Sequence, residues 1–318
     1  MPVPRPFHAD TPNRYPPCPF PPKDEGRGPF FRAFFLTPLA FTLCSCAGGV
    51  LDPKGPIGAA QKSILLNSLG VMLAIVIPTI IATLATAWWF RATNKRASYR
   101  PDFTYSGRVE MVVWSIPAMV VLLLGGIAWV GAHDLHPAKP ISSPVAPVRV
   151  QVVSLDWKWL FIYPDLGIAS VNRLVLPTGT PISFSLTSSS VMNSFFVPQL
   201  GTQIYTMSGM ATRLNLQADH PGVYRGMSAQ YSGDGFSDMH FKVHALPAAE
   251  FRDWAKATRL KGGALTTSSF AALSRPSKNV PTETYSSVSP GLFDAIVEMR
   301  IAPSLADARA CTPLKTKG

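Results

Sequence analysis

The sequence predicts a membrane protein with a hairpin of two transmembrane α-helices, followed by an all-β domain and short C-terminal helices. Two long apolar segments, 63–90 and 109–132, predict the two helices. Downstream, the runs VRVQVVSLDWKWLFIYP, VNRLVLPTGTPISFSLTSSS and SFFVPQLGTQIYTM are β-rich and punctuated by Pro, Gly and Ser, which predicts a sandwich or barrel. The composition agrees, because 47% hydrophobic and 15% charged residues are unusual for a water-soluble protein.

Three segments precede the first predicted helix. Residues 1–28 are too rich in proline for a helix or a central strand, so we expect a disordered leader or a start codon assigned too early. Residues 29–45 combine a basic flank, a short apolar stretch and small residues, which is typical of a signal peptide. Residues 46–62 are then expected to form an N-terminal segment on the periplasmic side.

The end of the predicted signal peptide, Leu43-Cys44-Ser45-Cys46, resembles a bacterial lipobox, in which the cysteine after the cleavage site is acylated. Cys46 fits best as the lipidated residue because Leu43 precedes it by three positions. Cys44 fits less well, and an ordinary signal without lipidation remains an alternative. All four cysteines of the chain lie outside the predicted β domain, so no disulfide framework is expected there.

The charge distribution predicts the orientation in the membrane. The linker 91–108 carries five basic residues and one acidic residue, which places it in the cytoplasm by the positive-inside rule. The β domain, 133–250, is then periplasmic, in agreement with lipidation at Cys46. Residues 251–318 lose the strand pattern, and FRDWAKATRL and GLFDAIVEMRIA predict short amphipathic helices there. The net charge of +11 comes with no nucleic-acid-binding motif, so no nucleic-acid partner is expected.

Three stretches of the β region carry a more specific pattern: DWKWLFIYP, SVMNSFFVPQLGTQIY and GMSAQYSGDGFSDM. Together with the lipobox and the helix hairpin, they resemble subunit II of the haem-copper terminal oxidases, from about Cys46 to the C-terminal region. The resemblance implies a cupredoxin-like barrel. In cytochrome c oxidases this barrel holds a binuclear copper centre, CuA, with ligands from a V-x-H-S-F-x-V-P-x-L motif and a C-x-E-x-C-x-x-x-H-x-x-M loop.

The positions that match the CuA motifs have lost nearly all of their metal donors. Serines replace both cysteines, and a serine hydroxyl is a weak donor that stays protonated at pH 7. His240 and His244 do not substitute, because four positions along a strand separate them by about 13 Å. We therefore expect no metal and no cofactor in this chain. The matching positions are Asn193, Ser228, Gln230, Ser232, Phe236 and the retained Met239.

The loss of CuA implies the quinol-oxidising, cytochrome bo-type branch of the family, and the LDPKGPIG run after the lipobox fits that branch. The resemblance implies a non-redox subunit of a proton-pumping ubiquinol oxidase in the bacterial inner membrane. Its partners are expected to be a subunit I that holds haems and copper, subunits III and IV, membrane lipid, and ubiquinol as the substrate of the complex. The alternatives are a copper-containing cytochrome c oxidase subunit and a lipid-anchored binding or sensory protein that reuses the barrel.

Glu110 is the only carboxylate in the two apolar segments. At the start of a helix, a carboxylate can simply stabilise the helix dipole or pair with Arg108. The resemblance implies instead that Glu110 lies at the mouth of the K proton channel of subunit I and collects protons from the cytoplasm.

Trp157 and Trp159 belong to the DWKW motif, where a tryptophan of the copper-bearing relatives passes electrons. Without copper behind it, that role has no acceptor. Both side chains are expected to pack against the membrane-facing surface of the barrel.

Overall fold

The computed structural model describes residues 49–98 and 102–301, which belong to one compact unit of the chain, Ala47–Gly318. The predicted leader, signal peptide and Cys46 lie outside the described residues, as does the tail from 302 onward.

The two predicted helices are present, and each is long and apolar enough to cross a membrane. They are α2 (Pro56–Trp89) and α3 (Gly107–Asp134). α2 begins seven residues before the predicted start at Ser63. Proline at the first helical position needs no N–H donor and already has a helical φ, so Pro56 starts the helix before the apolar run begins. α3 extends two residues beyond each predicted end, which is within the usual uncertainty of helix boundaries.

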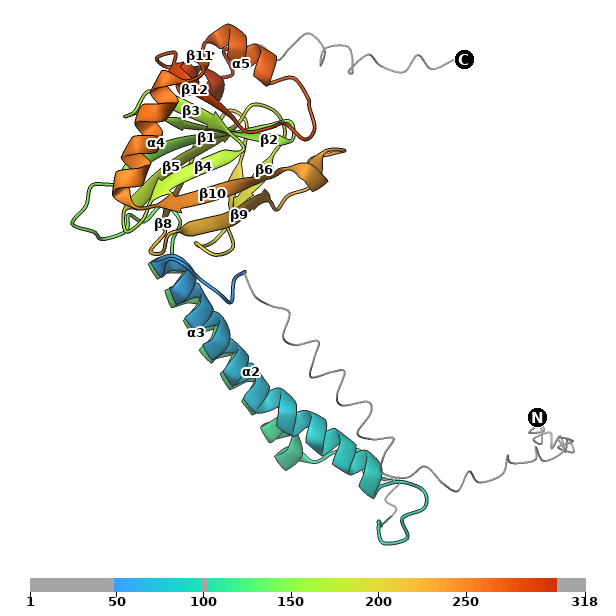
Figure 1. Ribbon diagram of the computed structural model, residues 1–318. Helices are drawn as coiled ribbons and strands as arrows, with labels where there is room; N and C mark the ends of the chain where they lie inside the picture. Colours follow the sequence, from blue (N-terminus) through green and yellow to red (C-terminus); the bar gives the residue numbers. More distant parts are fainter. Residues whose placement is uncertain (1–48, 99–101, 302–318) are drawn as a thin grey trace, which may run out of the picture. The chain divides into compact units, whose positions relative to one another are not determined.

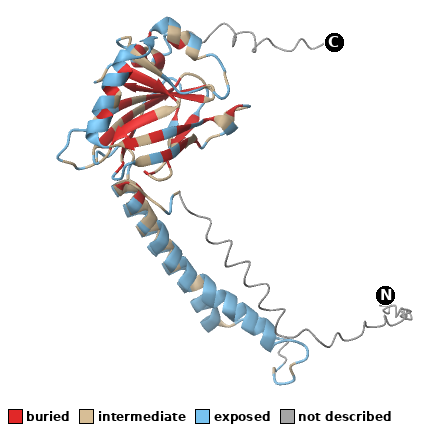
Figure 2. Cartoon of the chain, viewed as in Figure 1, coloured by how far each residue is buried: buried red, intermediate tan, exposed pale blue. Residues whose placement is uncertain are grey.

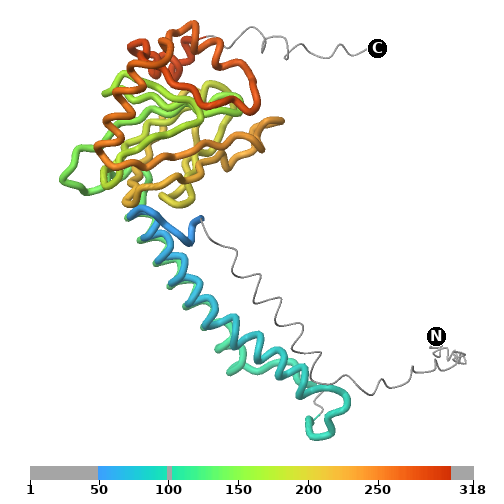
Figure 3. Tube along the Cα trace, in the orientation of Figure 1, coloured from blue at the N-terminus to red at the C-terminus, as the bar shows by residue number. Residues whose placement is uncertain are grey.

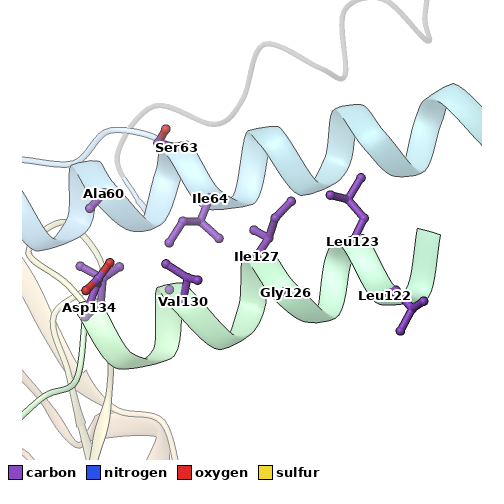
Figure 4. A pocket seen from close by; sticks show the side chains of 11 residues that line it. Ala60, Ser63, Ile64, Leu122, Leu123, Gly126, Ile127, Val130 and Asp134 are labelled. Carbon is purple, nitrogen blue, oxygen red and sulfur yellow. The ribbon is translucent and has the colours of Figure 1, made fainter. Parts of the chain in front are cut away.

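The two helices approach each other closely at Gly131. A Cβ atom at this position would lie 2.8 Å from Cδ1 of Ile64, so a larger residue would push the helices apart. Beside this contact lies an open apolar pocket of about 720 Å³. The side chains of Ile64 from α2 and of Ile127 and Val130 from α3 point into the space between the helices (Figure 4).

The residues just before α2 are hydrogen-bonded to the β domain. The Lys54 N–H donates to the Gln199 carbonyl (2.7 Å), and the Lys54 carbonyl accepts from the Asp219 N–H (2.8 Å). Gly55 is required at its position because a Cβ atom there would lie 2.0 Å from the Gln217 carbonyl oxygen. The LDPKGPIG run therefore joins the first helix to the barrel.

The β domain consists of two sheets (Figure 1). The seven-stranded sheet has the order β11-β12-β3-β2-β1-β5-β8, and the five-stranded sheet has the order β4-β10-β9-β6-β7. The strands are β1 (Val148–Leu155), β2 (Lys158–Tyr163), β3 (Ile168–Val171), β4 (Arg173–Pro177), β5 (Pro181–Ser188), β6 (Asn193–Phe196), β7 (Ile204–Thr206), β8 (Thr212–Gln217), β9 (Gly222–Ser228), β10 (His240–Leu246), β11 (Gly263–Leu265) and β12 (Glu283–Val288). This architecture agrees with the predicted fold class.

The strand β2 is buried on both faces, as the continuous red of the central strands illustrates (Figure 2). Trp159, Phe161 and Tyr163 belong to the core that also contains the side chains of the five-stranded sheet. Leu160 and Ile162 belong to a second core that contains residues of two C-terminal helices, α5 (Thr267–Leu273) and α6 (Leu292–Val297). Alternate residues of one strand thus stabilise two separate cores.

The prediction of a purely helical C-terminal region was incomplete. The region contains α4 (Ala248–Leu260), α5 and α6, but it also supplies two strands to the larger sheet. After α4 the chain returns to the sheet (Figure 3), where β12 pairs antiparallel with β3 and β11 pairs parallel with β12. These strands are short, and β12 (ETYSSV) has no buried residue, so its composition carries no apolar alternation.

Candidate functional site

The matching CuA positions lie where the end of β9 meets the start of β6. Asn193 is the first residue of β6 and Ser228 is the last residue of β9, and these strands are neighbours in the smaller sheet. The Ser228 hydroxyl donates to Asn193 Oδ1 (3.1 Å) and lies at the same distance from the Gln230 carbonyl oxygen. Both Asn193 and Ser228 are buried. Their side chains therefore connect the two strands at positions that match the CuA motifs.

The loop between β9 and β10 adds two further matching positions, Ser232 and Met239. Met239 is buried, and its carbonyl accepts from the Ser228 N–H (3.0 Å). The Ser232 hydroxyl lies 3.8 Å from the Met239 sulfur. Asn193, Ser228, Ser232 and Met239 thus form one connected group, which we call the serine cluster.

Two of the matching positions do not join the serine cluster through their side chains. Gln230 contributes its main-chain carbonyl, which accepts from the Ser228 hydroxyl, and not its side chain. Phe236 begins a short 3-10 helix, Phe236–Asp238, and its ring lies 5.6 Å from the exposed ring of Tyr231. An aromatic side chain has no hydrogen-bonding reason to turn inward, and it packs at the edge of the loop instead.

The donor set of the serine cluster does not suit copper. It consists of two hydroxyls, one amide and one thioether, whereas a thiolate-bridged centre needs soft, deprotonated sulfur ligands. Within residues 49–98 and 102–301, no group of three or more His, Cys, Asp or Glu side chains is arranged to hold a metal ion. No step of metal chemistry is therefore assigned to these residues.

Trp157 packs against the loop that contains Ser232 and Gly235. Its backbone has a φ of 63°, which is unusual for a large side chain. Its indole N–H donates to the Ser232 carbonyl (3.0 Å). A Cβ atom on Gly235 would lie 2.4 Å from the indole ring, so only glycine allows this contact. The strained turn is stabilised by this packing and hydrogen bonding.

Trp159 lies directly inside the core, and the expectation that both tryptophans face the membrane was wrong. It is fully buried, with its ring centroid 5.5 Å from those of Phe195 and Phe241. The alternation of Trp159, Phe161 and Tyr163 along β2 is the sequence signal that predicts this inward orientation.

Lys158 is a buried residue that sequence reasoning missed. Its side chain is 1% exposed, and its ammonium donates to the Arg275 carbonyl (2.7 Å) and the Ser277 hydroxyl (2.6 Å). Burial lowers the pKa of the Lys158 amine below its usual range. The Asn172 side chain also links β2 to the loop after α5. It accepts from the Trp159 N–H and donates to the Val280 carbonyl, both at 2.9 Å. The loop after α5 is therefore fastened to β2 beside the serine cluster.

Glu110 lies in the first turn of α3 with an exposed side chain. The structure shows no ion pair between its carboxylate and Arg108, although both residues are described. Its place in the first turn still favours the helix dipole. The geometry therefore leaves the carboxylate accessible to solvent at the linker end of the hairpin.

Known protein families and individual relatives match the region of the chain that contains this site. The family model described as cytochrome c oxidase subunit II, periplasmic domain, matches residues 166–246, and the COX aromatic-rich motif matches 259–304. Subunit 2 of cytochrome bo(3) ubiquinol oxidase from Pseudomonas aeruginosa is 47% identical over 258 residues, which cover 81% of this chain and 78% of the relative. The chain belongs to the ubiquinol oxidase subunit II family.

Other members of the ubiquinol oxidase subunit II family are similarly close. The Pseudomonas putida protein of the same description is 44% identical, covering 90% of this chain and 94% of its own length. Ubiquinol oxidase subunit 2 of Acetobacter aceti is 46% identical, covering 81% and 84%. Membership confirms the resemblance and the cupredoxin-like fold class. It also makes the chain a membrane-anchored subunit of an oxidase complex and a partner of subunit I.

Proposed function

We propose that this chain is a non-redox subunit II of a proton-pumping ubiquinol oxidase that reduces O2 to water. The observation that carries the proposal is the serine cluster, because hydroxyl and amide groups join the strands where a CuA centre would require thiolates and imidazoles. Ubiquinol is dissolved in the membrane, so its electrons need no copper relay in a periplasmic domain. The barrel then serves to cover the outer face of subunit I.

The proposal also assigns the other components of the complex and its location. Haems and copper belong to subunit I, with subunits III and IV as further partners, and the complex lies in the bacterial inner membrane. This assignment accounts for a subunit II whose hairpin is exposed over most of its apolar length in the isolated chain. A partner with its own transmembrane helices would cover part of that surface.

The proposal is tested by purifying the complex through an affinity tag on this chain. We expect a polytopic subunit to co-purify, together with haem detected by pyridine haemochrome spectra. The preparation should oxidise ubiquinol with O2 uptake and should not oxidise cytochrome c. Recovery of the chain alone, without haem or oxidase activity, would instead support a lipid-anchored binding or sensory protein.

We also propose that Cys46 is lipidated, on the basis of the lipobox that precedes it. Cys46→Ser should abolish incorporation of labelled fatty acid, while Cys44→Ser should leave it unchanged. Two transmembrane helices already anchor the chain, and a lipid adds little to such insertion. The Cys46→Ser oxidase should therefore assemble and turn over normally. Lipid labelling that persists in this variant would contradict the assignment.

Glu110 is proposed as a proton-entry residue at the cytoplasmic side of the complex. Glu110→Ala should slow steady-state ubiquinol oxidation severalfold, with haem content and assembly unchanged, because the accessible carboxylate no longer collects protons. Glu110→Asp should restore part of the rate. Asp102→Asn is the matched control, since it removes the other carboxylate of this loop region. Full turnover of Glu110→Ala would return Glu110 to a purely helix-stabilising role.

A further inference from the structure

The linker end of the hairpin contains a pocket that is unrelated to the serine cluster. It has a volume of about 780 Å³ and is lined by Phe90, Arg91, Ala92, Asn94, Ala97, Ser98 and Phe103. We call it the linker pocket. Its volume lies within the range of about 300–1,000 Å³ that is common for small-ligand sites. The opposite end of α2 is bonded to the periplasmic domain, so the linker pocket lies at the cytoplasmic end.

Arg91 is held in place beside the linker pocket. Its guanidinium lies 4.7 Å from the Trp88 ring centroid, in a cation–π contact. Its Nε donates to the Thr93 hydroxyl (3.0 Å), and its Nη1 lies 3.4 Å from the Trp88 carbonyl oxygen. None of the hydrogen bonds found among the described residues uses Nη2. A positioned guanidinium with an available donor edge is the group that recognises phosphate oxygens.

The other polar groups near the linker pocket would not repel a bound anion. The C-terminal carbonyls of α2 carry partial negative charge, but Asn94 Nδ2 donates to the Trp89 carbonyl (2.5 Å) and Arg91 covers that of Trp88. None of the lining residues that the structure describes is acidic. The whole linker 91–108 carries five basic residues against one acidic residue. The electrostatics therefore favour a negatively charged ligand.

The position of the linker pocket at the level of the lipid headgroups indicates that the negatively charged ligand is a phospholipid. Trp88 and Trp89 are both exposed and directly precede it, and paired tryptophans of this kind mark the level of the lipid headgroups. Phe90 and Phe103 are also exposed, and they line the linker pocket with apolar surface that suits the glycerol and upper acyl region. The cytoplasmic leaflet supplies anionic phospholipid at this depth.

We propose that the linker pocket binds the headgroup of an anionic phospholipid of the cytoplasmic leaflet, with Arg91 as the phosphate ligand. Charge complementarity, the fixed guanidinium and the aromatic walls together select this occupant over a zwitterionic phospholipid. The proposal does not depend on the fate of the CuA positions or on the role of Glu110.

The test uses the intact complex, reconstituted into phosphatidylcholine vesicles that contain a minor fraction of phosphatidylglycerol. After mild re-extraction, mass spectrometry measures how much of each phospholipid stays bound. We expect the wild type to retain phosphatidylglycerol in preference to phosphatidylcholine. Arg91→Gln should reduce that retention about fivefold, because the charge-assisted hydrogen bonds between the guanidinium and the lipid phosphate are lost. Arg91→Lys should fall between the two, because it keeps the charge without the planar donor edge.

Lys95→Gln is the matched control, since it removes the same charge from an exposed linker residue that does not line the linker pocket. The Lys95→Gln complex should retain as much phosphatidylglycerol as the wild type. Equal losses in Arg91→Gln and Lys95→Gln would show a diffuse charge effect and overturn the site. Displacement of the lipid by inorganic phosphate would overturn it as well, because the ligand would then be a soluble anion. Unselective lipid retention by the wild type would show that another subunit covers the linker pocket.

Discussion

Trp159→Ala is expected to lower the free energy of unfolding of the β domain by about 3–5 kcal/mol. The side chain is fully buried and contacts Phe195 and Phe241, and those two rings stack on each other 5.2 Å apart. Removing the indole leaves a cavity beneath β6 and β10, the strands that carry Phe195 and Phe241. Pulse proteolysis of the full chain in increasing urea measures the change without using tryptophan fluorescence.

Two other variants separate packing from hydrogen bonding. The Trp159 indole N–H is buried and has no partner among the described residues, so its desolvation already costs about 1–3 kcal/mol. Trp159→Phe removes this cost together with some volume, and we expect it to lower stability by less than about 1.5 kcal/mol. Tyr231→Ala, at an exposed aromatic of the nearby loop, should change stability by no more than about 0.5 kcal/mol. A loss as large for Trp159→Phe as for Trp159→Ala would contradict this account.

Copper is expected to bind this chain only after its missing donors are restored. The wild-type chain, expressed with copper and purified in detergent, should show no thiolate–copper absorption and no stoichiometric copper. Restoring the donors should create a purple, copper-binding centre, because the loop length is unchanged and the serine cluster already brings four of the positions together. The substitutions are Asn193→His, Ser228→Cys, Gln230→Glu, Ser232→Cys and Phe236→His.

The control for restored copper binding carries the two histidines and the glutamate but keeps both serines. It should bind no purple centre, since the thiolates are the ligands that share electron density between coppers. A purple wild-type chain would overturn the non-redox role proposed for this subunit. If the five-residue variant folded but bound no copper, the loop would differ from that of the copper-bearing relatives, with Phe236 as the first position to examine.

The sequence predicted those features that depend on local pattern. Helix location followed from apolar length. The resemblance to two CuA motifs singled out the residues of the serine cluster, which hydrogen bonds bring together in the structure. The burial of Lys158 was not predictable, because its acceptors, the Arg275 carbonyl and the Ser277 hydroxyl, lie more than a hundred positions away along the chain. The strand β12 was missed for the same reason, since a short polar strand is defined by its pairing with β3 and β11 and not by its own composition.

The pairing of β3 with β12 also sets an order of events during secretion. β2 covers one edge of β3, whereas the opposite edge stays bare until Glu283–Tyr285 has crossed the membrane. A bare edge is a template for pairing with other chains, so the half-exported domain is its most aggregation-prone form. The incomplete barrel is therefore most open to pairing with other chains until β12 is in place. Defects in the C-terminal region should then reduce the yield of this subunit more than the turnover of the oxidase molecules that do assemble.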